Sequence, residues 1–163
     1  MTSRALEAPP FFSQNSDGVF VGNDPARGPW SADHCHAGPV TGLAARAAEI
    51  AVGAEKMLCR LTLDILRPLP LAGLRVAAET TRHTRTLATT QITVHDLDNT
   101  LCALGTSMHL VRKDLGVVPT APVTPLRRAD AVSGPFSIGA GLHDKPYFGQ
   151  FLDVAYPPEF GLN

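Results

Sequence analysis

Apolar and polar side chains alternate along much of residues 57–112, with the period of two that is typical of β-strands. Four runs carry the pattern, at residues 57–65, 74–83, 86–95 and 100–112. The residues that share one face of the first run are Met57, Cys59, Leu61, Leu63 and Ile65. Those that share one face of the last run are Cys102, Leu104, Thr106, Met108 and Leu110. Because the connections between consecutive runs are short, the sequence predicts an antiparallel meander.

Residues 38–52 have instead the three-and-four spacing of a helix. Pro39 suits the first helical turn, where its missing N–H costs nothing, and Gly53 suits the stop. The predicted apolar face of this helix consists of Val40, Leu43, Ala44, Ala47, Ile50 and Ala51. So many alanines make a slim helix, which can lie close against a sheet that curls around it.

Residues 1–37 form an irregular leader, broken by prolines and glycines, in which residues 18–22 are the one candidate strand. After residue 112 the periodicity is lost: the last part of the chain holds seven of the fourteen prolines together with several aromatic residues. The predicted organisation is one α+β domain at 1–112, with a single helix against an antiparallel sheet, and a Pro- and aromatic-rich extension at 113–163. We expect the extension to pack on the domain or on a partner subunit.

Composition narrows the function classes. The net charge of -1 shows no basic excess for nucleic acid, so that class of partner is not expected. The three cysteines are far apart and form neither a disulfide framework nor a zinc ribbon, and no metal site is predicted. The N-terminus lacks the apolar core of a signal peptide, and no window approaches the roughly 20 apolar residues of a membrane span. We therefore expect a cytoplasmic protein without membrane contact.

Two motifs, in this order and spacing, resemble a known family. The first is Trp30 followed by HCHAGPV at 34–40 and AARAAE at 44–49; the second is LTLDILRPLP at 61–70. Together they resemble the thioesterase-like superfamily of hot-dog proteins, close to the N-terminal repeat of the acyl-CoA thioesterase II type. The resemblance implies a single hot-dog domain that binds, and often hydrolyses, acyl-CoA or related thioesters. It implies no cofactor, since coenzyme A is part of the substrate.

Larger members of the family fuse two such repeats, and a lone repeat leaves a sheet edge exposed. We therefore expect a homo-oligomer, either a dimer or a dimer of dimers, with the site at a subunit interface. The family's usual general bases are not in their usual places. Its Asp and Gln positions fall at Arg60 and near Ser107, and Ala44 and Ala45 occupy the place of the helix carboxylate in other hot-dog thioesterases. Three functions therefore stay open: a thioester hydrolase, a non-hydrolytic acyl-thioester-binding protein or partner subunit, and an enzyme of secondary metabolism.

The start of the helix is the first candidate site. Unpaired N–H groups and the positive end of the helix dipole meet there, so a thioester carbonyl would be polarised. Gly38 allows close approach, and Gly38, Val40 and Thr41 are the possible donors because Pro39 has no N–H. His36 is a candidate general base, or else it shapes the turn. Cys35 and His36 are adjacent and point to opposite sides, which argues against a nucleophile–base pair.

The remaining candidates lie on the strands. Asp64 could orient the attacking water, or it pairs with a neighbouring arginine across the sheet. Arg82 and Arg85, at a turn between two strands, could meet the phosphates of coenzyme A or be ordinary surface arginines. Ser107 is a candidate substrate-binding residue through the resemblance alone.

Overall fold

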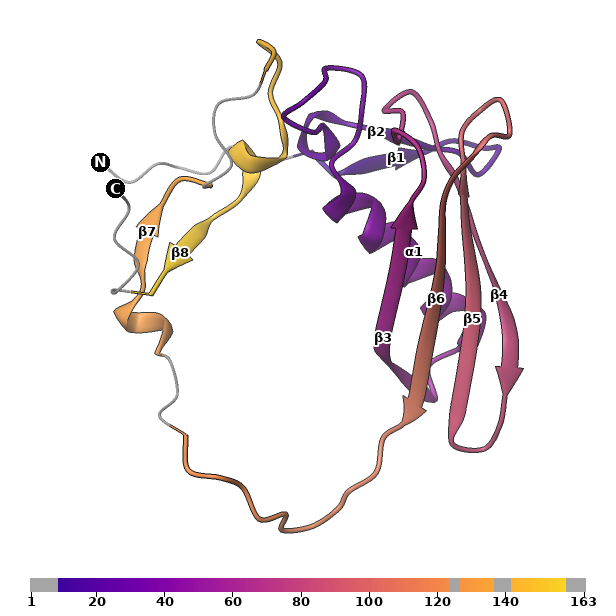
Figure 1. Cartoon of the computed structure of the whole chain (residues 1–163), viewed down its shortest axis with the longest axis vertical. Coiled ribbons are helices and arrows are strands. Elements are labelled where there is room, and N and C mark those ends of the chain that lie inside the picture. The colour runs from indigo at the N-terminus through magenta and orange to yellow at the C-terminus, as the bar shows by residue number, and fades with distance from the viewer. Residues whose placement is uncertain (1–8, 124–126, 137–141, 158–163) are drawn as a thin grey trace.

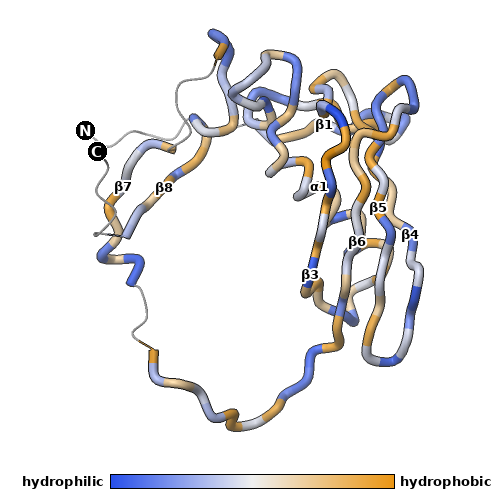
Figure 2. Tube along the Cα trace, in the orientation of Figure 1, coloured by the Kyte–Doolittle hydropathy of each residue, from blue (hydrophilic) through white to orange (hydrophobic). Residues whose placement is uncertain are grey.

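One helix lies across a four-stranded antiparallel sheet, as the sequence predicts (Figure 1). The computed structural model describes residues 9–123, 127–136 and 142–157. The helix is α1 (Ala37–Val52), and the strands are β3 (Lys56–Ile65), β4 (Arg75–His83), β5 (Leu87–His95) and β6 (Leu101–Val111). The strand order is β3-β6-β5-β4, so β3 and β4 are the two edges of this sheet. Figure 2 shows apolar and polar residues mixed along all four strands.

The helix begins one residue before the predicted start and ends at the predicted glycine. The N-cap is His36, and Gly53 ends the helix with φ 88°, donating its N–H to the Glu49 carbonyl at 2.9 Å. The residues of the helix that are buried against the sheet and its surroundings are Pro39, Val40, Ala44, Ala48 and Val52. Ile50, which the spacing placed on the apolar face, is instead 68% exposed.

The face of the sheet that α1 covers carries small side chains. Ala103, Gly105 and Ser107 of β6 are buried there, opposite Val94, Ile92 and Thr90 of β5. A Cβ atom on Gly105 would lie 2.6 Å from the Thr62 carbonyl oxygen, so this position needs glycine. Leu104, Thr106, Met108 and Leu110 of β6 do share a face, as predicted, but that face is turned away from α1. Cys102, predicted to lie on the same face, is instead buried in the core with Val40, next to a register shift in the pairing of β5 and β6.

The face prediction for β3 is wrong at its start. A β-bulge at Cys59 shifts the register, so that Leu58 pairs with His109 and Arg60 pairs with Met108. Leu58 therefore lies on the covered face with Leu61 and Leu63, while Met57 is 44% exposed and Cys59 is exposed. A period-two pattern cannot predict a bulge, because the extra residue inverts the alternation on one side of it.

The leader contains two strands rather than one. β1 (Phe12–Gln14) pairs with β2 (Phe20–Gly22) as a short hairpin, followed by the 3-10 turn η1 (Asp24–Ala26). Phe20 and Leu74 exchange backbone hydrogen bonds of 2.9 Å in both directions, which fixes the hairpin to the start of β4. A strand of three residues has too little alternation to be recognised in the sequence.

The C-terminal part leaves the sheet after β6 and returns to the start of α1 (Figure 1). It contains η2 (Arg128–Asp130), β7 (Val132–Gly134), η3 (Phe148–Phe151) and β8 (Val154–Tyr156), with β7 and β8 paired as a hairpin. Phe148 donates its N–H to the Arg27 carbonyl at 2.8 Å, and Leu142 donates to the Pro29 carbonyl at 2.7 Å. These bonds attach residues 142–157 to the loop that precedes the helix. Within the described residues no helix is long and apolar enough to cross a membrane.

Candidate functional site

His36 organises the start of α1. Its Nδ1 accepts a hydrogen bond from the Gly38 N–H at 3.1 Å, so the neutral ring carries its proton on Nε2. The ring stacks between Phe148, at a centroid distance of 4.3 Å and an angle of 12°, and Trp30, at 5.7 Å and 11°. Burial lowers the pKa of His36. His36 therefore acts structurally as a neutral N-cap, and the nitrogen that a general base would need is already occupied.

Gly38 is exposed and lies beside the same ring stack. A Cβ atom at this position would lie 3.2 Å from His36 Nδ1 and 3.5 Å from Phe148 Cζ. Its N–H is shared with His36, while the N–H groups of Val40 and Thr41 belong to the ordinary ladder of the helix. A carbonyl oxygen placed at the helix start would thus compete with His36 for one donor, in the positive field of the helix end.

A groove of about 690 Å³ opens beside Gly38, along the side of α1 that faces the β1–β2 hairpin. Its size falls in the range of small-molecule sites. Its apolar lining includes Phe11, Phe12, Phe20, Pro39, Leu43 and Phe148. Gln14 and Arg46 are its polar side chains with hydrogen-bonding groups. A second hollow of about 310 Å³ shares Gln14, Phe20, Leu43 and Arg46 with the groove and continues it along the helix.

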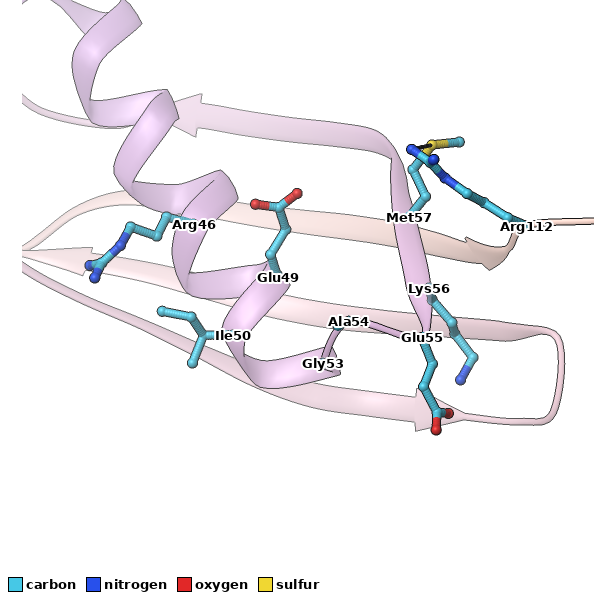
Figure 3. A pocket seen from close by; sticks show the side chains of 9 residues that line it. All are labelled: Arg46, Glu49, Ile50, Gly53, Ala54, Glu55, Lys56, Met57 and Arg112. Atoms are coloured by element: carbon cyan, nitrogen blue, oxygen red, sulfur yellow. Dashed lines mark hydrogen bonds between the residues drawn. The ribbon is translucent and has the colours of Figure 1, made fainter.

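The other end of the helix has a hollow of different chemistry. This hollow has a volume of about 840 Å³. Figure 3 shows the side chains that line it, which are the charged residues Arg46, Glu49, Glu55, Lys56 and Arg112 together with Ile50, Met57 and the turn at Gly53 and Ala54. Lys56 is buried, and its Nζ lies 3.1 Å from His83 Nε2. This end is therefore charged, whereas the groove at Gly38 is mostly apolar.

A chain of buried polar groups lies on the covered face of the sheet. Ser107 Oγ lies 2.7 Å from Thr90 Oγ1 and 2.8 Å from His109 Nε2. His109 is fully buried, and its Nδ1 has no hydrogen-bond partner among the described residues. Burial lowers the pKa of His109, and the Glu49 carboxylate opposes this. Thr90 and His109 were not among the predicted site residues. The two-residue spacing of Ser107 and His109 does place those two side chains on one face of a strand.

The predicted site residues are dispersed. His36, Gly38 and Val40 meet at the helix start, together with Thr41, whose Oγ1 donates to the Ala37 carbonyl at 2.9 Å. Ser107 is 3% exposed and lines none of the grooves described here. The structure buries it under the helix.

Asp64 and the two arginines lie elsewhere. Asp64 pairs with Leu104, on the face of the sheet turned away from α1, and so the chain does not bring it to Gly38. Arg82 and Arg85 are exposed at the β4–β5 turn. The neighbouring His83 contacts Lys56, which follows the C-terminal end of the helix, and so these arginines lie at the opposite end from Gly38.

Neither metal nor thiol chemistry is supported by the side chains around the helix start. Among the described residues no three His, Cys, Asp or Glu side chains come together as a metal site. Burial raises the pKa of the Cys35 thiol to about 12, and its Sγ faces the Pro70 carbonyl at 3.7 Å. At neutral pH Cys35 is a protonated, buried thiol and a poor nucleophile.

Solved structures with the same architecture identify the fold. A Bacillus halodurans protein crystallised with CoA matches with a TM-score of 0.53 and 17% identity, over 58% of this chain and 69% of its own. The E. coli PaaI protein of the phenylacetic acid degradation operon matches with a TM-score of 0.51 and 20% identity, over 58% of this chain and 70% of its own. A hypothetical thioesterase of Streptococcus pneumoniae, solved with coenzyme A, matches with a TM-score of 0.51 and 15% identity, over 62% of this chain and 84% of its own. At these identities the likeness shows the fold alone, which is the predicted α+β hot-dog.

The sequence narrows the class to a family. Residues 26–110, just over half of the chain, match the acyl-CoA thioesterase N-terminal domain. The chain belongs to this family of thioesterase-like hot-dog domains. No curated protein matches the sequence.

Proposed function

We propose that this protein binds an acyl-CoA or related acyl thioester in the groove beside α1 and hydrolyses it. The groove is the observation that carries the proposal: it is apolar, of ligand size, and it begins at Gly38, where the helix dipole would polarise a thioester carbonyl. Family membership supports the substrate class, and two similar folds were solved with CoA. The reaction needs no cofactor, since coenzyme A arrives as part of the substrate.

We expect a homo-oligomer whose subunits pair along β3, across the sheet from the β4 residues Val76 and Ala78 that line the continuation of the groove. No strand of the described residues pairs with the outer side of the edge strand β3. Large apolar side chains are exposed on β3, just after it and on the nearby helix. These side chains are Ile50, Met57, Ile65 and Leu66. A two-fold pairing of β3 edges would continue the sheet and cover them. Light scattering is then expected to give at least twice the chain mass of 17.3 kDa, and a monomer would rule out this interface.

The second candidate is a protein that binds an acyl thioester without hydrolysing it, as a carrier, as a partner subunit or as part of an enzyme of secondary metabolism. One observation favours it. Ala44, where other hot-dog thioesterases are expected to have a carboxylate, is completely buried against the sheet. Asp64 cannot replace that carboxylate within one chain, because it lies on the far face, and pairing of β3 edges would keep it there.

The deciding experiment is an acyl-CoA panel measured in two ways, by release of free thiol and by calorimetric binding. Because Cys59 is exposed, the assay protein carries Cys59→Ser, which removes a background signal from the thiol reagent. Turnover of at least one acyl-CoA is expected. Tight binding without thiol release would replace hydrolysis by the binding function, and absence of both would overturn the proposal.

Two variants on this background test the two bases that the sequence predicted. If His36 or Asp64 is the general base, His36→Ala or Asp64→Asn should lower turnover by roughly 10²–10⁴-fold while binding is largely kept. If neither substitution lowers turnover, hydrolysis depends on the helix end and on positioning of the water instead. The thermal midpoint of each variant separates this from loss of fold, since His36 is also the N-cap.

A further inference from the structure

Among the described residues that line the groove beside α1 and its continuation, one is charged. Their walls come from the β1–β2 hairpin, from the exposed side of α1, from β4 and from Phe148 of the C-terminal part. Arg46 is the charged side chain in both linings. Arg46 also borders the charged hollow at the end of the helix. A cation at the junction of an apolar groove and open solvent is where an amphipathic anion would place its charged end.

Arg46 has no partner within the described part of the chain. The two ion pairs found there join Arg27 to Asp24 and Arg127 to Asp130. The nearest carboxylate along the helix is Glu49, and Figure 3 shows the Arg46 and Glu49 side chains pointing away from each other. The guanidinium is thus free to form the two parallel hydrogen bonds that a carboxylate accepts.

The distance from Gly38 to Arg46 fixes the size of the ligand. Arg46 is eight residues after Gly38 in the helix, which at 1.5 Å per residue is about 12 Å along the axis. An extended acyl chain of medium length covers most of this distance, and the flexible arginine side chain covers the rest. Gln14 lies on the opposite wall and can add a second hydrogen bond.

We propose that the preferred acyl group ends in a carboxylate, so that the ligand is the thioester of a medium-chain dicarboxylic acid with Arg46 bound to its free carboxylate. This rests on the proposed function, because it takes the thioester carbonyl to lie at Gly38. It adds a specificity-determining residue and a substrate class. The apolar body of the acyl chain lies against Phe20 and Leu43, and the charge at its end leaves the groove at Arg46.

The first test compares octanoyl-CoA with suberyl-CoA, its analogue with a terminal carboxylate, by calorimetry and by thiol release. Wild type is expected to favour suberyl-CoA by about tenfold or more, as for a hydrogen bond to a charged group. In Arg46→Gln the ratio should fall to about one. The matched control is Arg60→Gln, which removes an exposed arginine from the far face of the sheet and should keep the wild-type ratio. Equal affinity for both ligands in wild type, or a preference that survives in Arg46→Gln, would overturn the inference.

The second test fills the groove. Nothing lies within 4 Å of a Cβ atom added to Gly42, which lines the groove, so Gly42→Leu extends a side chain into the groove without a clash at its base. Binding of both ligands is expected to fall about tenfold or more. Gly42→Ala serves as the fold control, with an equal or higher thermal midpoint because alanine is the better helix former. Unchanged binding in Gly42→Leu would mean that the ligand lies elsewhere.

A third arm separates the two proposals. If neither thioester is bound or hydrolysed, the proposed function is wrong, and free suberate is titrated against wild type and Arg46→Gln. Binding of suberate that is lost in Arg46→Gln would keep Arg46 as an anion site. Absence of such binding would overturn this inference as well.

Discussion

The two ends of α1 differ in almost every physical respect, although both belong to one helix on one sheet. At the N-terminal end three segments of the chain meet, and the rings of Trp30, His36 and Phe148 stack over the first turn. At the C-terminal end the helix stops at Gly53 beside an open hollow of charged side chains. The contrast teaches where the chain has concentrated its aromatic residues: around the helix end whose dipole is positive.

The C-terminal end nevertheless has a feature that the N-terminal end lacks. Beneath it lies His109, fully buried with one ring nitrogen unpaired among the described residues. Leaving such a group without a partner costs about 1–3 kcal/mol. The stacked end is therefore satisfied, while the open end keeps an unsatisfied group under its sheet.

The thiols should differ most. Burial raises the pKa of Cys35, near the helix start, to about 12, whereas Cys59 is exposed at the bulge of β3. A thiol reagent at pH 8 is expected to modify Cys59 at least about 10²-fold faster than Cys35, because only the thiolate reacts. Mass spectrometry of digested samples over time measures both rates. Comparable rates would mean that the helix start opens readily.

Gly38→Val should lower the turnover of acyl-CoA strongly while the thermal midpoint changes little. The added atoms meet His36 and Phe148 and occupy the place of the carbonyl, so turnover is expected to fall by about 10²-fold or more. The control at the other end is Glu55→Gln, which changes the charged hollow and should stay within about twofold of wild type. Full turnover in Gly38→Val would show that the site is not at this end of the helix.

Stability should depend on pH through both ends. Burial lowers the pKa of His36 and of His109 below the ordinary 6.5, so the unfolded chain binds protons that the folded chain does not. The contribution of these two histidines to the free energy of unfolding is therefore expected to be largest above about pH 6.5 and to fall as the pH drops below that value. Denaturant titrations at several pH values measure the slope.

Two variants divide that slope between the ends. His36→Asn keeps an N-cap acceptor without the titration, and His109→Leu removes the buried imidazole. Each variant is expected to reduce part of the loss of stability below pH 6.5. The Glu49 carboxylate opposes the lowering of the His109 pKa. A wild-type slope in both variants would mean that other groups cause the pH dependence.

The aromatic stack should make the smallest contribution. Phe148→Ala removes a ring that stacks on His36 and is expected to cost about 1 kcal/mol. Chymotrypsin should then cleave at Tyr147 and Phe151 sooner than in wild type, while Phe11→Ala, which removes a more distant ring contact of 6.0 Å, should have less effect. Equal cleavage of Phe148→Ala and wild type would mean that the backbone bonds at 142–148 hold the segment alone.

The sequence predicted the order of the main elements and the helix to within one residue, because these depend on local periodicity and on caps such as Gly53. It did not predict the bulge at Cys59, the exposure of Ile50 or strand β1, since each depends on pairing across the chain. The groove was also beyond prediction. Its walls are brought together from residues near 11, 20, 43 and 148, and no local pattern links them.

Trp30 is the single tryptophan of the chain, and it stacks on the ring that caps the helix. The residue is 59% exposed, yet one face of its indole lies against His36. Indole emission is quenched by a neighbouring imidazolium and changes when polar solvent is displaced. The protein thus carries an intrinsic fluorophore at the helix start, so that protonation of His36 and the arrival of a ligand can be followed in the unmodified chain, without a label and in real time.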